Sequence, residues 1–528
     1  MKITNYSTDE NEIRLTHYRK KGILRLVFSR LVWILFLLFM QLYILYTLFS
    51  WMNGFYTHVS VIMIFFRIVM TIVLFNTDMD SSAKLTWLII ISVGPVPGTL
   101  FFAYTITDLG HIKLKKNVLN VIANTKNVLP MQDDVSDELR RDKRSLSELS
   151  TYLNTTGCFP VYKNTDLKYY PSGEYCFDDL IEILESAEKF IFMEFFIYDE
   201  GYMWGRVLKI LADKVKSGVE VRVMYDGMCE MELLPHNYDA RLRELGIKAK
   251  TFSPIHPFIS TYYNFRDHRK VLVVDGKVAV TGGINMADEY INKIERFGHW
   301  KDSVLFLRGD AVKSFTLMFL QMWSFDEEKV ELGNYLEYDG GSYPEASGYV
   351  MPFSDVPLDD EKVGENVYMD ILNRASDYVH ITTPYLILDD EMKRALQYAA
   401  ARGVEVSIIL PGIPDKHMAY ALAKNHYKSL LRYGINLYEY TPGFMHAKNF
   451  ICDDKKAVVG SINLDYRSLY HHFECAAYMY RTDVIHEIEQ DFQDTLKQCR
   501  KITPETIKNE KIYYRAAGHV MKLVAPLM

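Results

Sequence analysis

The sequence predicts an α/β protein with two homologous lobes, each built on a mostly parallel central sheet, behind an apolar N-terminal region. Three observations lead to this fold class. An excess of apolar residues is concentrated before residue 106. From residue 151 onward, apolar runs of strand length alternate with amphipathic helical segments, a pattern typical of βαβ units. The same alternation returns roughly 180 residues later, which indicates an internal repeat.

Residues 1–110 are expected to form a membrane region with two to three hydrophobic segments, at about 31–51, 59–75 and 85–105. The first segment contains no charged residue and is long enough to cross the hydrocarbon core as a helix. It is too long for the apolar core of a signal peptide, and no small-residue cleavage site follows it. These features predict a multi-pass protein of the cell membrane.

The third segment is interrupted by the run from Gly94 to Gly98, which contains two prolines. Proline and glycine inside a spanning helix require neighbouring groups that satisfy the freed backbone. A re-entrant or interfacial hairpin is therefore the alternative to a third span. Basic residues flank the region at both ends, and three spans cannot place both clusters on the inner side. The number of spans and the side of the catalytic domain are left open.

Residues 111–150 are predicted to be a charged linker. Its residues 132–150 are a run of mixed charge, which favours a solvated helix with ion pairs between successive turns. The two lobes follow at residues 151–335 and 345–528. Strands are expected at 190–198, 219–225, 378–383 and 404–410, and helices at 172–189, 203–217, 391–401 and 417–433.

One motif occurs once in each lobe and has the form H-x-K-x4-D-x6-G-[GS]-x-N. Residues two apart on a strand point to the same face, so the histidine and lysine of each copy face the same way. The aspartate indicates a hairpin, and the returning strand brings the asparagine back to the same end. We expect both copies to face one cavity. The candidate site residues are His268, Lys270, Asp275 and Asn285 in the first lobe and His446, Lys448, Asp453 and Asn463 in the second.

The paired motifs favour chemistry on a phosphate group. Lysine ammonium and asparagine amide groups donate hydrogen bonds, so together they suit an anion with several oxygens. Two histidines on opposite sides of one phosphorus can divide the work, because one attacks as a neutral imidazole while the other protonates the leaving alcohol. This chemistry requires neither a metal nor another cofactor. Asp275 and Asp453 lie in turns and are as consistent with a structural role as with a chemical one.

A zinc site formed by His268, His446, Asp275 and Asp453 is the alternative interpretation of these residues. The lysine between each histidine and aspartate argues against it, because it places a positive charge beside the ion. The net charge of −7 and the pI near 6.1 do not favour nucleic acid as a partner. The six cysteines form no C-x-x-C pair, as expected of thiols in a reducing compartment.

Further stretches resemble a known family, namely Thr383 to Tyr385, Tyr438 to Phe444 and Asn463 to Ser468. Together with the paired motifs, they make the chain similar to the phospholipase D superfamily and, within it, to the bacterial cardiolipin synthases. The resemblance implies transfer of a phosphatidyl group between two phosphatidylglycerol molecules through a phosphohistidine, which gives cardiolipin and glycerol. The partners it implies are the phospholipid substrate and the membrane bilayer.

The same resemblance assigns roles to further residues. Asp302 and Glu474 match the carboxylates that orient the catalytic imidazoles, and His268 matches the nucleophile. The chain departs from the family at Asp267, where asparagine is usual. A negative charge beside His268 is expected to raise the pKa of its imidazole.

A phospholipase D-type phosphodiester hydrolase is the alternative function. Transfer and hydrolysis differ in whether a lipid hydroxyl or water reaches the phosphohistidine. A nuclease would need a basic groove, which the acidic composition does not favour. A non-catalytic membrane scaffold is expected to have lost part of at least one motif, and both are intact. Acceptor preference and assembly into a homo-oligomer are left open.

Overall fold

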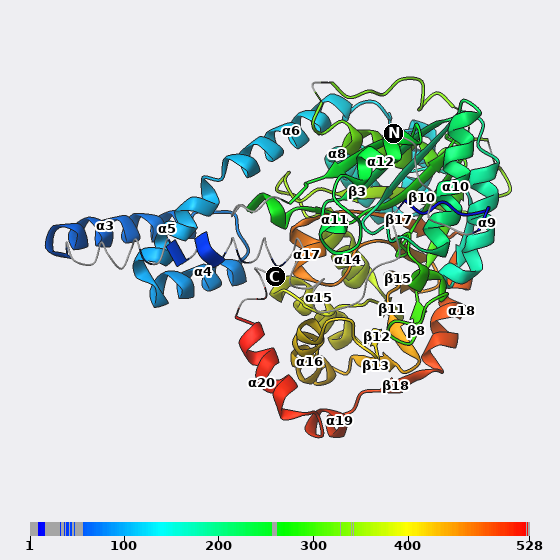
Figure 1. Ribbon diagram of the computed structural model, residues 1–528. Helices are drawn as coiled ribbons and strands as arrows, with labels where there is room; N and C mark the ends of the chain where they lie inside the picture. The colour runs from blue at the N-terminus through cyan, green and yellow to red at the C-terminus, as the bar shows by residue number, and fades with distance from the viewer. Residues whose placement is uncertain are drawn as a thin grey trace.

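Two β-sheets, one in each half of the chain, form the body of the molecule (Figure 1). We describe them from a computed structural model. The description covers residues 9–15, 32, 36, 39–41, 43–44, 47, 56–255, 261–327, 329–338, 340–341, 343–523 and 525. Most of the predicted apolar segment 31–51 therefore lies outside the described residues.

The first lobe contains a seven-stranded sheet in the order β1-β9-β7-β6-β2-β3-β4. Its two faces have separate cores, because alternate residues of β2 point to opposite sides. Ile191 and Met193 pack against helices on the outer face, whereas Phe190 and Phe192 face the second lobe. The elements are β1 (Asp166–Tyr170), α9 (Gly173–Glu185), β2 (Phe190–Phe195), α10 (Tyr202–Lys216), β3 (Glu220–Asp226), α11 (Met228–Glu232), α12 (Tyr238–Glu244), β4 (Lys248–Phe252), β6 (Lys270–Val274), β7 (Val278–Gly282) and β9 (Val304–Arg308).

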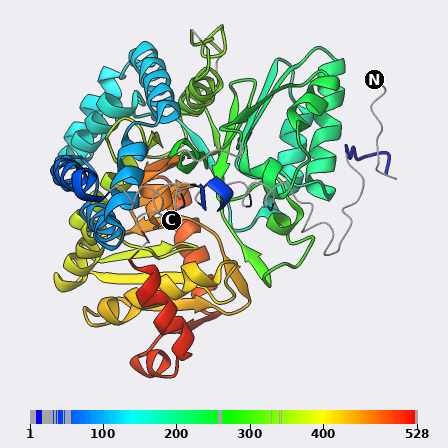
Figure 2. The ribbon, with the colours of Figure 1, turned by 60° about the vertical axis from the view of Figure 1, so that its left-hand side comes forward.

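The second lobe repeats this strand order as β10-β17-β16-β15-β11-β12-β13 and adds β18 at one edge. The internal repeat predicted from the sequence is therefore present in the sheets, and Figure 2 shows the two lobes in green and in yellow to red. The elements are β10 (Tyr349–Asp355), α14 (Val363–Arg374), β11 (Tyr378–Thr382), α15 (Asp390–Ala401), β12 (Glu405–Pro411), α16 (His417–Leu431), β13 (Asn436–Tyr440), β15 (Asn449–Cys452), β16 (Lys456–Gly460), α17 (Tyr466–Tyr470), β17 (His472–Tyr480) and β18 (Cys499–Lys501).

The prediction of mostly parallel sheets is wrong, because both sheets are mixed. Along the strand orders given above, the parallel neighbours are β2, β3 and β4 in the first lobe and β11, β12 and β13 in the second. The connections explain the difference. Helical crossovers return the chain in the same direction, whereas the tight hairpins β6–β7 and β15–β16 reverse it. Each motif leads into the strand that enters one of these hairpins.

Contacts between the lobes are made by helices and by short strands. Helices α13 (Val312–Trp323) and α18 (Val484–Leu496) contribute to the core between the two sheets. Lys301 of the first lobe forms a buried ion pair with Asp491 of α18 at 2.7 Å. Strand β5 (Arg266–Asp267) pairs in parallel with β17, and β8 (His299–Lys301) pairs in parallel with β14 (Gly443–Met445). These two cross-lobe pairs end beside the motif histidines.

The segment predicted as a charged linker forms three amphipathic helices, α6 (Leu109–Thr125), α7 (Asp133–Asp142) and α8 (Arg144–Gly157). Many of its charged residues are exposed, as expected. However, Leu139, Leu146 and Leu153 are fully buried in the core of the second lobe. The segment is therefore part of a folded lobe, because each helix has an apolar stripe beneath its charged face.

Helices α3 (Tyr56–Phe75), α4 (Ser81–Val93) and α5 (Pro95–Ile106) form an arm that projects from the body (Figure 1). The predicted third segment does not form one continuous helix. It breaks at Gly94, and the ring of Trp87 lies 5.4 Å from that of Phe101. In a straight helix these two positions would be about 21 Å apart. The chain therefore folds back on itself, which agrees with the hairpin alternative.

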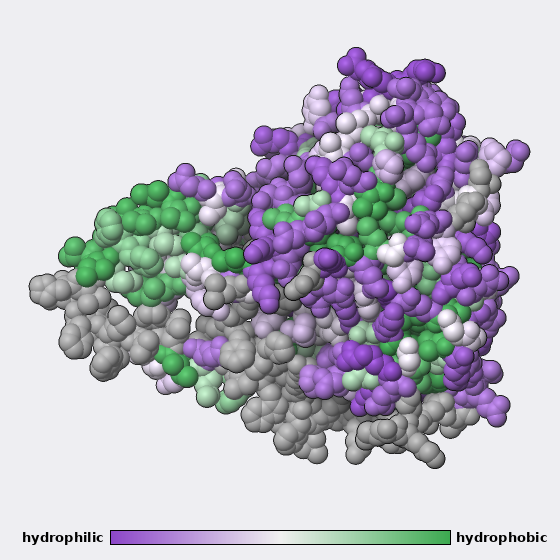
Figure 3. Space-filling view, turned by 90° about the horizontal axis from the view of Figure 1, so that it is seen from above, coloured by the Kyte–Doolittle hydropathy of each residue, from purple (hydrophilic) through white to green (hydrophobic). Residues whose placement is uncertain are grey.

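The arm has an apolar surface, which is green in the space-filling view of Figure 3. The side chains of Val61, Phe65 and Val93 are 69%, 68% and 84% exposed. The C-terminal region, with α19 (Pro504–Lys508) and α20 (Ile512–Met521), reaches the arm, since the Thr86 hydroxyl donates to the Leu523 carbonyl at 2.8 Å. Among the described residues, none of the helices combines the length and the apolarity needed to cross a bilayer.

Candidate active site

The two motif histidines are buried and are held crosswise by carboxylates of the opposite lobe. Nδ1 of His268 lies 2.9 Å from Oε1 of Glu474, and Nδ1 of His446 lies 2.6 Å from Oδ2 of Asp302. With Nδ1 donating to a carboxylate, Nε2 of each ring carries a lone pair that is available for chemistry. Both predicted carboxylates therefore lie at the imidazoles, each at the histidine of the other half.

The cross-lobe strand pairs explain this exchange. Strand β5 leads into His268 and pairs with the start of β17, which carries Glu474. The backbone N–H of His268 donates to the Phe473 carbonyl at 3.0 Å. In the same way, β14 leads into His446 and pairs with β8, which precedes Asp302. Each histidine is thus placed opposite the other lobe's carboxylate by main-chain geometry.

The small residue after the motif glycine makes room for the carboxylate or binds it. A Cβ atom added to Gly283 would lie 1.9 Å from Oδ1 of Asp302, so a larger residue cannot fit there. The equivalent residue in the second lobe, Ser461, donates its hydroxyl to Oε2 of Glu474. The carboxylate that lies against this position therefore explains why it is glycine in one lobe and serine in the other.

Lys270 and Lys448 are buried beside the imidazoles, and each ammonium donates to the backbone carbonyl of the histidine two residues earlier. Burial lowers the pKa of Lys270 to about 8 and that of Lys448 to about 7. Each lysine is close enough to both histidines to disfavour a positive imidazole. The two motifs therefore lie within electrostatic range of each other, and an anion between them would stabilise the charged lysines.

Burial and the neighbouring lysines lower the pKa of both imidazoles. Burial is the larger cause, and the pKa of His446 falls to about 4. For Asp302, burial opposes ionisation, but His446 and Lys448 outweigh it and lower the carboxyl pKa. Burial raises the pKa of Glu474 well above its usual range. The two histidine–carboxylate pairs therefore have similar geometry, but the carboxyl pKa is lowered in one pair and raised in the other.

The rise in the pKa of His268 that Asp267 was expected to cause is not found. The pKa of His268 is lowered, first by burial and then by Lys270. Asp267 precedes His268 on an extended strand, so its side chain points to the opposite face. There the carboxylate accepts from the backbone N–H of Arg269 at 3.2 Å and lies 3.7 Å from the Arg269 guanidinium.

Asp275 and Asp453 are placed away from the imidazoles, which corrects their assignment as catalytic residues. Asp275 follows the five-residue strand β6, which separates it from Lys270 by about 16 Å. Its carboxylate accepts from the backbone N–H groups of residues 188–190 at 2.7–2.8 Å. Asp453 binds the N–H groups of residues 376–378 at 2.9–3.0 Å. Both aspartates therefore tie a hairpin to the start of the neighbouring strand.

The two motif asparagines differ in their surroundings. The amide of Asn285 accepts from the Ile197 N–H at 3.1 Å and donates to the Tyr290 hydroxyl at 2.7 Å, so both ends of the amide are engaged. Asn463 is also buried, but its Oδ1 atom has no hydrogen-bond partner among the described residues. Of the two asparagines, Asn463 is therefore the one with an open polar atom among the described residues.

Aromatic and imidazole rings that the sequence did not single out form the walls of the site. The Trp300 ring lies 5.1 Å from that of His446, and the His472 ring lies 5.3 Å from that of His268. Trp300 and His472 each stand two residues before the orienting carboxylate, at equivalent points of the repeat. Comparison of the two halves could have identified them, because the histidines were already aligned by the motif.

One group in the described part of the chain has the geometry to bind a metal ion, and it is not the predicted zinc set. His268, His472 and Glu474 place their ligand atoms within 4.8 Å of one another. Positive neighbours, including Lys270 and Arg266, surround this group and oppose a cation. The predicted set cannot form, since Asp275 and Asp453 are bound to backbone amides elsewhere.

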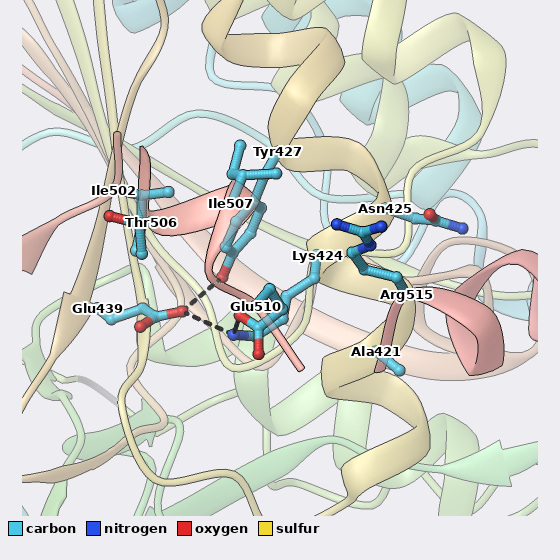
Figure 4. Close-up of a pocket in the computed structure, with 10 residues that line it drawn as sticks. All are labelled: Ala421, Lys424, Asn425, Tyr427, Glu439, Ile502, Thr506, Ile507, Glu510 and Arg515. Carbon is cyan, nitrogen blue, oxygen red and sulfur yellow. Dashed lines mark hydrogen bonds and ion pairs between the residues drawn. The ribbon is translucent and has the colours of Figure 1, made fainter. Parts of the chain in front are cut away.

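Two pockets lie away from the two motif histidines. A pocket of about 370 Å³ among α16, α19 and α20 is occupied at its centre by Lys424, which bridges Glu439 and Glu510 (Figure 4). A second pocket, of about 270 Å³, lies at the carboxyl ends of β11 and β12 and includes Phe444. Phe444 packs on Trp300 at 4.8 Å, so the second pocket adjoins the His446 side of the site.

Comparison with known proteins agrees with this geometry. The family model described as the phospholipase D-like domain of cardiolipin synthase matches residues 180–323 and 368–496, and each range contains one motif histidine. A cardiolipin synthase of Alkalihalophilus pseudofirmus is 31% identical over 93% of this chain and 98% of its own. An uncharacterized protein of Streptococcus mutans is 56% identical over 86% of this chain and 98% of its own.

A solved structure shares the fold. The crystal structure of phosphatidylserine synthase from Haemophilus influenzae aligns with a TM-score of 0.53 over 73% of this chain and 98% of its own, at 15% identity. The match to the family model covers both lobes, and the A. pseudofirmus relative spans nearly the whole chain. The chain therefore belongs to the cardiolipin synthase family of phospholipase D-like proteins.

Proposed function

We propose that the protein transfers a phosphatidyl group from one phosphatidylglycerol to the headgroup hydroxyl of another and releases glycerol. One observation carries this proposal: His268 and His446 are each held by a carboxylate of the opposite lobe, beside two buried lysines. Two oriented imidazoles and two ammonium groups suit a phosphodiester that is first cleaved and then remade. The names of the cardiolipin synthases among its relatives support the same reaction class.

The proposed reaction has two balanced steps. First, Nε2 of one histidine attacks phosphorus, the P–O bond to the headgroup glycerol breaks, and the other histidine protonates the departing oxygen. Next, a hydroxyl of the second phosphatidylglycerol attacks the same phosphorus. Its proton passes to the second histidine, and the P–N bond breaks. Cardiolipin and glycerol leave, and both imidazoles return to their starting forms.

The lysines and carboxylates have supporting roles in this proposal. Lys270 and Lys448 offset the negative charge that grows on the non-bridging oxygens, so that the chemistry needs no divalent metal. Asp302 and Glu474 hold each ring with Nε2 toward the phosphorus and stabilise its positive form. The open carbonyl oxygen of Asn463 supports a further role for this residue, in which it accepts a hydrogen bond from the headgroup.

The deciding experiment incubates the purified full-length protein in detergent with phosphatidylglycerol labelled in its acyl chains. Cardiolipin as the labelled product supports transfer. Phosphatidic acid as the sole product would favour hydrolysis of the same phosphohistidine by water. Glycerol is released in both cases, so the lipid product must be identified. The same assay with EDTA should give the same yield, whereas a loss reversed by one added metal would point to the His268, His472 and Glu474 group.

We also propose that the protein acts at the cell membrane, with the arm as its contact to the bilayer. The apolar segment 31–51, the exposed apolar side chains of α3 and the hairpin α4–α5 support this proposal. The substrate has two acyl chains and stays in the bilayer, so the catalytic body must reach its headgroup from the membrane surface. Recovery of the native protein in the soluble fraction of lysed cells would argue against it.

A further inference from the structure

We infer that a second anion site lies beside the catalytic pair and holds the phosphate of the phospholipid that accepts the phosphatidyl group. The inference rests on the proposed function, in which two phosphodiesters meet in each turnover. It is carried by three side chains that the proposed chemistry leaves unused: Arg266, Arg467 and His472. Arg266 and His472 are joined by the cross-lobe strand pair that leads to His268, and Arg467 lies within electrostatic range of both.

The strand register places this site one step from the catalytic histidine. Arg266 on β5 lies opposite His472 on β17, and the next pair with side chains on the same face is His268 and Glu474. Two residues along a strand correspond to about 7 Å. The rings of His268 and His472 are 5.3 Å apart. The two phosphates of the proposed product are joined by one three-carbon glycerol bridge, which matches this separation.

Arg266 and His472 are buried with open polar atoms. Nη1 of Arg266 donates to the Ser253 carbonyl at 2.8 Å and lies 3.2 Å from an Asp226 carboxylate oxygen, which fixes the guanidinium. Its Nη2 atom has no hydrogen-bond partner in the described part of the chain, and neither has either ring nitrogen of His472, whose Nδ1 lies 3.7 Å from Oε1 of Glu474. The two residues are 2% and 8% exposed. Buried polar groups without partners are costly, so these atoms are suited to a ligand.

The surrounding charges favour an anion as this ligand. Arg467, an exposed residue of α17, lies within electrostatic range of both Arg266 and His472. The nearby carboxylates already have partners: Asp226 binds Arg266, Asp465 accepts from the Ser468 N–H, and Glu474 binds His268 and Ser461. Guanidinium groups bind phosphate through two parallel hydrogen bonds. Arg467, the open Nη2 atom of Arg266 and the ring nitrogens of His472 are therefore available to hydrogen-bond an anion.

In the other half of the repeat, the polar atom at the equivalent position is already hydrogen-bonded. Trp300 occupies the position equivalent to His472, and its indole N–H donates to Asp302 at 3.3 Å. The pseudo-symmetric pair is therefore closed on the His446 side and open on the His268 side. One open site agrees with one acceptor phosphate in each turnover.

The site also lies toward the arm. Tyr466, next to Arg467, interacts with Ser82 of α4, and Tyr263, whose carbonyl accepts from Arg266, lies near Tyr104 of α5. Figure 1 shows α17 on the side of the body from which the arm projects. A lipid headgroup that arrives along the arm would reach this site before the catalytic pair.

The test is a competition between two acceptors in one tube. Wild-type enzyme in detergent receives labelled phosphatidylglycerol together with ethanol, and the ratio of cardiolipin to phosphatidylethanol is measured. Ethanol has no phosphate, so this ratio reports acceptor recognition and is independent of the amount of folded enzyme. We expect Arg467→Gln and His472→Phe to lower the ratio about ten-fold or more, and His472→Asn, which keeps a donor and an acceptor, to lower it less.

Lys497→Gln is the matched control, because Lys497 is an exposed cation just after α18 that pairs only with Asp494 among the described residues. It should leave the ratio at the wild-type value. An unchanged ratio in both Arg467→Gln and His472→Phe would overturn the second anion site. Failure of the proposed function is a separate outcome, in which the wild-type enzyme forms phosphatidic acid and no cardiolipin.

Discussion

Lys270 and Lys448 illustrate how burial sets the pH range over which a single side chain is charged. Their ammonium groups are buried, and burial lowers the two pKa values to about 8 and about 7. Both must be positive to receive a phosphate. In the free enzyme, a rise of pH through this range therefore removes the charge that binds the substrate, and a bound phosphodiester restores it by favouring the ammonium form.

The first prediction concerns pH. Because kcat/KM reports the free enzyme, it should fall as pH rises from 7 to 9. The fall in kcat should come at a higher pH than the fall in kcat/KM, because the bound phosphate keeps the lysines charged. Initial rates of cardiolipin formation between pH 5 and 10 test this. Lys448→Arg, which stays charged throughout, should move the fall in kcat/KM upward. A flat profile for the wild-type enzyme would contradict the proposed role of the lysines.

The second prediction concerns the catalytic pair. Either His268→Ala or His446→Ala should reduce cardiolipin formation at least about 10⁴-fold, because each histidine acts in both steps. His236→Ala is the matched control, since the His236 side chain is 62% exposed. Circular dichroism should show that all three variants are folded. Substantial turnover in either active-site variant would exclude a mechanism that uses both histidines.

At the scale of elements, the hairpins β6–β7 and β15–β16 are held by aspartates of the motif. Asp275 and Asp453 both have a backbone φ of 54°, a left-handed conformation that aspartate and asparagine tolerate better than most residues. Each carboxylate collects three successive backbone N–H groups of the chain that enters the adjacent strand. The aspartate of each motif is thus a structural residue. It holds the hairpin that follows the motif lysine.

The third prediction follows from this arrangement. Asp275→Asn keeps the turn conformation and weakens the three hydrogen bonds, so it should lower the free energy of unfolding by about 1.5–3 kcal/mol. The kcat of the folded fraction should stay within a few-fold of wild type. Urea denaturation followed by tryptophan fluorescence gives the first quantity, and the lipid assay gives the second. A folded variant with no activity would show that Asp275 takes part in the reaction.

The fourth prediction concerns the hairpin α4–α5. If its two ends emerge on the same side of the membrane, cysteines introduced at Ser81 and Thr107 should react with an impermeant maleimide from the same side as one at Lys497 on the body. All three positions are exposed. The background is a Cys499→Ser protein, because the other five cysteines are buried. Labelling of positions 81 and 107 from opposite sides would favour a spanning segment.

At the scale of the whole molecule, the lobes are joined mainly by packing. The core between the sheets includes residues of both lobes, and two strand pairs cross between them. The covalent connection from α13 to β10 passes through exposed residues such as Glu345. The association of the lobes should therefore not depend on this connection.

The fifth prediction tests this independence. A protease site inserted between Pro344 and Glu345 should allow cleavage into two fragments that co-elute and keep cardiolipin formation within about two-fold of the uncut protein. Size-exclusion chromatography and the lipid assay, before and after cleavage, measure both. Separation of the fragments with loss of activity would show that the peptide connection is needed to hold the site together.

Much of this organisation could be predicted from the sequence, because the repeat and the motif are local patterns. The positions of His268, Lys270, His446 and Lys448 follow from alternation along a strand. The exchange of Asp302 and Glu474 could not be predicted, since it depends on the cross-lobe strands β5 and β14, which are only two and three residues long. Strands this short leave no periodic signal.

The errors have equally specific causes. Parallel sheets were expected because the βαβ pattern was extended to strands that are connected by hairpins. The linker was expected to be solvated because its charges are frequent, while the buried leucines at 139, 146 and 153 are spaced over two helices. The open atoms of Arg266 and His472 were not visible in the sequence, because an unsatisfied hydrogen bond is a property of three-dimensional surroundings.

The exchange of carboxylates between lobes also bears on ancestry. A chain with one lobe would contain an imidazole whose orienting acid belongs to another copy, so it could catalyse only as a symmetric dimer. Duplication and fusion would preserve that dependence inside one polypeptide. After fusion the sequences of the two copies could also diverge, so that one acquired Trp300 and the other His472. On this view the fused enzyme gained the freedom to treat donor and acceptor differently, which a homodimer of identical subunits does not have.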